Sequence, residues 1–373
     1  MDKQVILAVA GAGKTYHICN ELDPLQRNLI IAFTHENISN IKNELMNAYG
    51  GIPELTTVST FDSFVYHECV LPYEPTISQC FREDSFQNRG ITLKKPPEQT
   101  ILRNGRPVAN PFYARKDSLN HYVADNKQYY CATLSELVIE VSKKDKAFIK
   151  RLTARINRFY DCVLIDEFHD FREFDYDLIL KLSKKTKKII LVGDYFQHSV
   201  SGTNNTGRPF KKKKAVVDYD SFVTDILKAG FNVDTSTLKS SRRCSKSVCQ
   251  YIAAKLGIPI ESQGINEGAV IWIDKDPETI LDDSTITKLV FSGSQSYSFK
   301  SMNWSYSKGD TINTVCVILT KDFENLNNDL FSTDKISAIT LNKLYVAMTR
   351  SKGDLYLMPQ SIFKRVKQKY LLD

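Results

Sequence analysis

Short apolar runs recur along the chain, and segments with helical spacing separate several of them. The runs are nearly all apolar instead of alternating with polar residues, which is typical of strands buried on both faces of a parallel sheet. We expect strands at Val5–Val9, Leu29–Phe33, Val163–Ile165, Ile189–Val192, Val270–Ile273, Lys288–Phe291, Val315–Leu319 and Leu355–Leu357.

Two segments between these runs have a clear helical pattern. Residues 36–49 place Ile38, Ile41, Leu45 and Met46 on one face, and a pair of glycines at 50 and 51 ends the pattern. Residues 245–256 predict a second helix, which ends before Gly257 and Pro259. The alternation of strand and helix predicts an α/β fold with two lobes.

Two stretches interrupt this rhythm and suggest the domain organisation. Residues 70 to about 130 are rich in proline and tyrosine and have no sustained period, so we expect an insertion in the first lobe at about 70–150. Residues 199–215 are polar, glycine-containing and lysine-rich, which predicts an exposed loop. We therefore place the first lobe at 1–200 and the second at 201–373.

Composition and charge narrow the function classes. The 373 residues are 42% hydrophobic and 11% aromatic, enough to fill two cores, and the net charge of +7 fits either a polyanionic partner or a solvated basic surface. No run approaches the roughly 20 apolar residues that cross a bilayer, so we expect no membrane partner and a cytoplasmic protein. The start of the chain predicts a core strand instead of a signal peptide.

The eight cysteines include no Cys-x-x-Cys pair. This spacing favours scattered thiols in a reducing compartment over a metal site, although Cys69, Cys80 and Cys131 could meet in space.

A phosphate-binding loop follows the first apolar run. Residues 8–15 read Ala-Val-Ala-Gly-Ala-Gly-Lys-Thr, a P-loop with Ala8 where Gly is usual. Small residues let backbone N–H groups surround phosphate oxygens, while Lys14 reaches the β- and γ-phosphates and Thr15 binds Mg²⁺. The alternative is a Gly-Lys-Thr turn that occurs by chance. The predicted nucleotide-binding residues are Ala10, Gly11, Ala12, Gly13, Lys14, Thr15 and Tyr16.

Two later strand ends supply polar groups that a P-loop enzyme requires. Asp166 would hold Mg²⁺ and Glu167 would orient and deprotonate the attacking water. Gln197, which follows Gly193-Asp194, would sense the γ-phosphate. Taken singly, these residues also fit a strand end with a helix cap and a polar turn.

The ordered series of motifs resembles superfamily 1 helicases of the UvrD/Rep type. After the P-loop come Thr34-His35-Glu36, Thr57–Phe64, Asp166–Asp170, Gly193–Gln197, Ser241–Cys244, Tyr306–Gly309 and Leu344–Ser351. Each segment is similar to a family motif, and the match runs from residue 8 to about 358.

This resemblance implies two RecA-like lobes that enclose ATP and Mg²⁺. Arg243 and Arg350 would stabilise charge on the γ-phosphate from the second lobe, with helix-surface roles as their alternatives. The residues that the resemblance places on single-stranded nucleic acid are Thr34, His35, Thr60, Phe61 and Lys308.

The sequence departs from the family pattern in several places. No full adenine-reading segment fits before Ala8, and Gln4 lies deep in the first strand. His169 replaces a Gln of the family pattern. Val200 stands where the family often has an aromatic side chain that stacks on a base, so stacking would come from Phe61, Tyr66 or Trp304. The large second-lobe insertion of full-length relatives is missing. The lysine run Lys211–Lys214 would either bind phosphates or form a solvated loop.

We therefore expect an ATP-dependent motor that moves on single-stranded DNA, or RNA. The resemblance implies the 3′–5′ direction and leaves duplex unwinding open. The alternative is a nucleic-acid-sensing ATPase switch that regulates a partner such as a nuclease in repair or anti-phage defence. A P-loop kinase would leave Tyr345–Arg350 unexplained.

Overall fold

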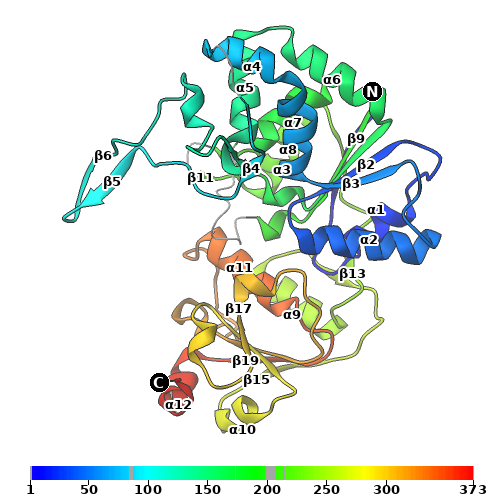
Figure 1. Ribbon diagram of the computed structural model, residues 1–373. Coiled ribbons are helices and arrows are strands. Elements are labelled where there is room, and N and C mark those ends of the chain that lie inside the picture. Colours follow the sequence, from blue (N-terminus) through cyan, green and yellow to red (C-terminus); the bar gives the residue numbers. More distant parts are fainter. Residues whose placement is uncertain (1, 84–86, 173, 199–206, 213–214, 373) are drawn as a thin grey trace.

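The computed structural model describes residues 2–83, 87–172, 174–198, 207–212 and 215–372, and a six-stranded parallel sheet forms its first part. The strand order is β12-β1-β9-β8-β2-β3, and every neighbouring pair is parallel. The strands are β1 (Asp2–Leu7), β2 (Asn28–Ala32), β3 (Thr56–Thr60), β8 (Cys162–Asp166), β9 (Lys188–Gly193) and β12 (Asn232–Asp234). Figure 1 shows this sheet in the upper half of the molecule.

A second parallel sheet lies below the first (Figure 1). Its order is β15-β19-β18-β16-β17. The strands are β15 (Val270–Trp272), β16 (Thr287–Val290), β17 (Ser301–Asn303), β18 (Val315–Ile318) and β19 (Leu355–Met358). Each sheet with its helices forms one RecA-like lobe, so the molecule has the α/β, two-lobed fold that the apolar runs predicted.

Successive side chains of the central strands point to opposite faces of the first sheet, as strand geometry requires. On one face they pack against α3 (Phe61–Phe64), α5 (Leu134–Lys144), α6 (Phe148–Phe159), α7 (Asp175–Ser183) and α8 (Tyr219–Lys228). On the other face lie α1 (Lys14–Asn20) and α2 (His35–Tyr49). This second core continues into α9 (Lys246–Leu256) and α11 (Ala338–Met348) of the second lobe. Helices α10 (Pro277–Asp282) and α12 (Gln360–Val366) cover the far face of the second sheet.

The predicted strands and both predicted helices are present, with ends shifted by one to a few residues. Gly50 ends α2 in a left-handed conformation (φ 72°), and the Ser245 hydroxyl caps α9 by accepting from Val248 N. The strands β3, β12 and β17 were not expected. All three lie at sheet edges and are short or polar, so they lack the apolar run that marks a central strand.

The connection from α3 to β8 contains the irregular part of the first lobe. It includes α4 (Glu74–Phe81), the pair β4 (Ile91–Thr92) and β7 (Tyr129–Tyr130), and the hairpin β5 (Thr100–Arg103) and β6 (Arg106–Ala109). Helices α5 and α6 also belong to it but pack into the first core.

Strand β12 pairs with β1 beyond residue 200, where the sequence placed the end of the first lobe. We therefore propose a boundary near residue 235. Of the predicted loop at 199–215, residues 199–206 and 213–214 lie outside the described residues, and Lys211–Lys212 pair with Ala215–Val216 as β10 and β11. In the described ranges, no helix combines the length and apolar character needed to cross a membrane.

Candidate active site

The P-loop runs from the end of β1 to the start of α1 and contacts the second lobe. Gly13 caps α1 in a left-handed conformation (φ 86°), and Gly11 is also left-handed (φ 73°). A Cβ at Gly11 would lie 2.7 Å from Cβ of Arg243 and 2.7 Å from Oγ of Ser241, and Arg242 N donates to Gly11 O at 2.9 Å. Glycine is required here both by the backbone conformation and by the close approach of the second lobe.

Two acidic residues at the end of β8 face the P-loop. Thr15 Oγ1 donates to Asp166 Oδ2 at 3.0 Å, and Glu167 N donates to Asp166 Oδ1 at 2.9 Å. Burial, and secondarily the charge of Glu167, raises the pKa of Asp166 to about 7. Glu167 adopts a left-handed conformation (φ 56°), which is uncommon for a residue with a side chain and directs Glu167 toward Lys14.

Glu167 lies between a lysine and a histidine. Its Oε2 is 3.5 Å from Nζ of Lys14 and 3.2 Å from Nε2 of the fully buried His169. Asp194 N donates to Nδ1 of His169 at 3.0 Å, so the ring proton of a neutral His169 sits on Nε2 and faces Glu167. Burial lowers the pKa of His169 well below its ordinary value, which keeps the ring neutral. His169 therefore lies between the ends of β8 and β9 and contacts Glu167 and Asp194.

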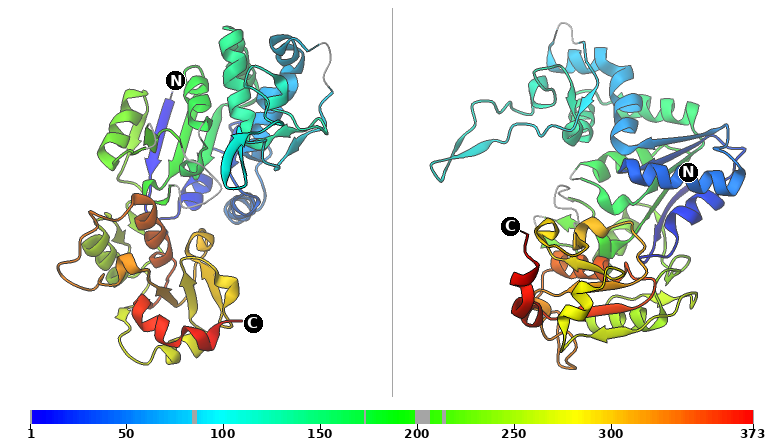
Figure 2. Two further views of the ribbon diagram at one scale, coloured as in Figure 1. Left: turned by 90° about the vertical axis from the view of Figure 1, so that its left-hand side faces the viewer. Right: turned by 60° about the horizontal axis from the view of Figure 1, so that its bottom comes forward.

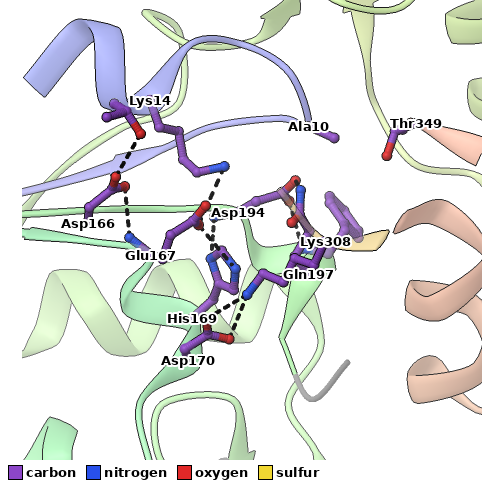
Figure 3. Close-up of polar contacts among 12 residues, drawn as sticks. Ala10, Lys14, Asp166, Glu167, His169, Asp170, Asp194, Gln197, Lys308 and Thr349 are labelled. Atoms are coloured by element: carbon purple, nitrogen blue, oxygen red, sulfur yellow. Dashed lines mark hydrogen bonds and ion pairs between the residues drawn. The ribbon is translucent and has the colours of Figure 1, made fainter. Parts of the chain in front are cut away.

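A short polar chain links Gln197 to the P-loop and the second lobe (Figure 3). Gln197 Nε2 donates to Asp194 Oδ2 at 2.9 Å, and Tyr345 OH donates to the same oxygen at 3.2 Å. The Tyr345 hydroxyl also accepts from Ala10 N at 2.8 Å. Burial raises the pKa of Asp194 to about 6. One phenol thus joins the P-loop, the end of β9 and helix α11.

Both predicted arginines line the site from the second lobe. Arg243 Nε donates to Thr311 Oγ1 at 2.9 Å and its NH1 donates to Thr349 O at 3.1 Å. Arg350 is buried and donates from Nε to Val346 O at 2.8 Å. Burial lowers the pKa of each guanidinium, but the high intrinsic pKa of arginine keeps both positive at neutral pH.

These side chains border one polar cavity of about 150 Å³ between the lobes. The structure brings together Gly11, Gly13, Lys14, Thr15, Tyr16, Asp166, Glu167, Gln197, Arg243 and Arg350 around it. Ala10 and Ala12 are buried beneath the loop. Asn37, Asn40 and Gly309 also line the cavity and were not expected. The two asparagines are three apart on the polar face of α2, a spacing that could have indicated a shared orientation.

The sequence left the nucleotide base without a binding element, and one aromatic side chain with a cationic neighbour lies beside the P-loop. The guanidinium of Arg242 lies 4.5 Å from the centroid of the Tyr16 ring, at the mouth of the P-loop. Tyr16 is 47% exposed, so its ring is available to a ligand. Gln4 lies within β1 and pairs with Ile190 and Asn232, away from the loop.

The residues predicted to bind nucleic acid fall into two groups. Thr34 and His35 are exposed after β2, and Thr60 is half-buried at the end of the neighbouring β3, so all three lie at the carboxyl edge of the first sheet. Thr34 and Thr60 also cap α2 and α3. Lys308 is half-buried and ion-paired with Asp170 of the first lobe.

The expectation that Phe61, Tyr66 or Trp304 stacks on a base is wrong for this structure. Phe61 is 1% exposed and packs against Phe33 and Phe171. Tyr66 is also buried, and Trp304 is fully buried with its indole N–H donating to Leu289 O. A short turn, η8 (Trp304–Ser307), places Trp304 inward and leaves Tyr306 75% exposed.

All eight cysteines are free, and Cys69 and Cys131 are buried while Cys80 is half-buried. In the part of the chain that the structure describes, no group of three or more His, Cys, Asp or Glu side chains is arranged to hold a metal ion. The Thr15 hydroxyl and the Asp166 carboxylate are the hard oxygen ligands that Mg²⁺ accepts, and Mg²⁺ commonly takes only one or two carboxylates together with phosphate and water.

Two known protein families match the sequence. A family described as the viral superfamily 1 RNA helicase core domain matches residues 114–359, and a family described as an AAA domain matches residues 2–203. No curated protein matches the sequence.

Solved structures with some similarity include an arterivirus nonstructural protein 10 helicase in complex with DNA (13% identity, TM-score 0.46). They also include the PRRSV helicase (14% identity, TM-score 0.45). The alignments cover 95% and 99% of this chain, but only 60% and 54% of the helicase chains, so this chain spans little more than half their length.

Proposed function

We infer the function of this chain from its family, since it belongs to the superfamily 1 helicases through the family described as the viral superfamily 1 RNA helicase core domain. Helicase domains of this kind hydrolyse a nucleoside triphosphate when nucleic acid is bound. We propose that this chain is an ATP-dependent motor that moves along single-stranded nucleic acid. The observation that carries the proposal is the cavity in which Lys14, Glu167 and Arg350 meet from two lobes.

The geometry supports a division of labour at this cavity. Lys14 would exchange its contact with Glu167 for the β- and γ-phosphates, and the P-loop N–H groups would surround them. Thr15 and Asp166 would hold Mg²⁺, which neutralises charge on the phosphate oxygens when bound. Glu167 would accept a proton from the attacking water, because its Oε2 is buried beside Lys14 and His169 but has hydrogen-bond geometry with neither.

The second lobe would complete the site when the lobes close. Arg243 and Arg350 would place positive charge against the γ-phosphate, as arginine fingers do. Gln197, Asp194 and Tyr345 are linked by hydrogen bonds. Through these bonds, the presence or loss of the γ-phosphate would affect helix α11. Opening and closing of the cleft during turnover would then move the two lobes along a strand.

Two observations favour different substrates. The motif series resembles UvrD/Rep helicases, which favours single-stranded DNA and the 3′–5′ direction, whereas the matching family is described as an RNA helicase core. We propose single-stranded DNA as the substrate and RNA as the alternative to be tested beside it. Contacts to the phosphate backbone distinguish poorly between the two sugars.

The decisive experiment is ATP turnover with no nucleic acid, single-stranded DNA and single-stranded RNA, each with wild type and Lys14→Ala. Stimulation that Lys14→Ala abolishes supports the motor. An absence of stimulation by both strands would contradict it. Stimulated turnover without strand displacement on a forked substrate would favour the alternative function, an ATPase switch that regulates a partner such as a nuclease.

A further inference from the structure

The hairpin formed by β5 and β6 projects from the first lobe and takes no part in its core. Figure 1 shows it reaching far to one side of the molecule, and the right-hand view of Figure 2 shows it standing clear of the two sheets. Every residue of both strands is exposed. The strands are joined by a two-residue turn at Asn104 and Gly105, both with positive φ (51° and 74°), which is the preferred turn of a tight, twisted hairpin.

The tip of the hairpin holds two arginines in direct opposition. Arg103 pairs with Arg106 across the antiparallel ribbon, so their side chains lie on the same face. Within the described residues, no ion pair or hydrogen bond involves either guanidinium. Like charges placed opposite each other destabilise a two-stranded ribbon. The stability of the hairpin therefore does not explain this arginine pair.

The surrounding segment is also basic and partly apolar. Between residues 90 and 114 the charged residues are Lys94, Lys95, Arg103 and Arg106 against Glu98 alone, a net charge of +3 of the +7 carried by the whole chain. On the opposite face of the ribbon from the arginines, Leu102 is 76% exposed. The hairpin therefore offers positive charge together with apolar contact area, and no part of the nucleotide site uses it.

We propose that the β5–β6 hairpin binds double-stranded nucleic acid next to the single strand held by the motor. This rests on the proposed function, since it adds a second contact on the same substrate. Phosphates would neutralise the repulsion between Arg103 and Arg106, which a neutral or basic protein surface would leave in place. A two-stranded ribbon also fits into the major groove of B-form DNA.

The test uses the full chain with both tip arginines neutralised, Arg103→Gln with Arg106→Gln. The matched control is Lys184→Gln with Lys185→Gln, which removes two exposed charges from the first lobe outside the hairpin. Binding is measured by fluorescence anisotropy on a 20-base-pair duplex of DNA, the same duplex of RNA, and a single strand, over a range of salt concentrations.

We expect the hairpin variant to bind at least one duplex about ten-fold more weakly, with the slope of log affinity against log salt reduced by about 2, one for each lost phosphate contact. The control should lose less than about two-fold. Single-strand-stimulated ATP turnover should remain at the wild-type rate. Unchanged affinity for both duplexes would overturn the proposal, as would an equal loss in the control.

A second variant removes the hairpin, with residues 100–109 replaced by Gly-Gly. Asn110 closes the base of the hairpin through bonds to Gln99 O and Glu98 O, so the replacement joins chain ends that already lie together. The melting temperature checks folding, and duplex affinity should fall at least as far as in the double variant. If wild type binds duplex but shows no stimulated turnover, the motor proposal fails while the hairpin proposal stands.

Discussion

The Nζ atom of Lys308 lies 2.7 and 2.6 Å from the two carboxylate oxygens of Asp170 and joins the second lobe to the first. Asp170 follows Asp166 and Glu167 on the same short segment, so this pair connects the nucleotide site to a lysine that the motif series places on nucleic acid. A phosphate of the bound strand would compete with Asp170 for Lys308. We therefore propose that strand binding would reach the acids around the nucleotide through this pair.

Opposite effects are expected from the two partners of this pair. Lys308→Ala should weaken single-strand binding about ten-fold, because a phosphate contact is lost, and lower the unfolding free energy by about 3 kcal/mol, because Asp170 stays buried without its partner. Asp170→Asn should strengthen single-strand binding, because Lys308 loses its competitor. Anisotropy titrations measure both. Changes in the same direction in the two variants would contradict the competition.

Removal of the phosphate-binding lysine or of the acid beside it should stop hydrolysis. We expect Lys14→Ala and Glu167→Gln each to lower stimulated ATP turnover by at least about 100-fold, in the range for loss of a positioned acid–base group. Lys42→Ala, an exposed lysine on α2, serves as the control and should keep the wild-type rate. Substantial turnover in Glu167→Gln would reassign the general base.

The two arginines should affect the chemical step more than nucleotide binding. Arg243→Lys and Arg350→Lys keep the charge but lose the planar fork, so turnover should fall about 100-fold or more while ATP affinity changes less than about three-fold. Lysine is chosen because Arg350 is buried and an alanine would leave a cavity. The exposed Arg365→Lys is the matched control. Equal losses of affinity and turnover would point to ground-state binding instead.

Tyr16 and Arg242 should bind the nucleotide base between or against them. Tyr16→Ala should raise KM for ATP about ten-fold with little change in kcat, since stacking on a base contributes about 1–3 kcal/mol. Tyr16→Phe retains the ring and is the control, and Arg242→Ala should resemble Tyr16→Ala. A normal KM in Tyr16→Ala would remove this pair from the base site.

A buried histidine should make stability fall in mild acid. Burial lowers the pKa of His198 to about 4, while the unfolded chain keeps an ordinary value near 6.5. Between these values the unfolded state binds a proton that the folded state does not, so this group lowers the unfolding free energy by about 3 kcal/mol as pH falls from 6.5 to 4.

Urea unfolding of wild type and His198→Asn at pH 7 and pH 4.5 isolates this effect. The raised pKa of Asp194 acts in the opposite sense, because its contribution falls as pH rises, but it is shared by both proteins and cancels in the difference. Wild type should lose more stability than the variant. An equal loss would exclude His198 as the acid-sensitive group.

Local sequence signals were sufficient for the central strands, the P-loop and the acids, because an apolar run or a glycine loop depends on neighbouring residues. They were insufficient for β3, β12 and β17, whose positions at sheet edges remove the need for an apolar run. The aromatic residues show the same limit. Trp304 and Tyr306 are two residues apart, and only the turn that holds them decides that one is buried and the other exposed.

The sequence by itself determined the two-lobed α/β fold and the residue types of the nucleotide site, since burial pattern and phosphate chemistry act over short stretches of chain. Only the tertiary structure decided which distant groups meet: Tyr345 with Ala10, Lys308 with Asp170, and Arg242 with Tyr16. These contacts depend on strand order and on the packing of one lobe against the other. The packing of both hydrophobic cores stabilises these contacts, and no single segment of the sequence forms either core alone.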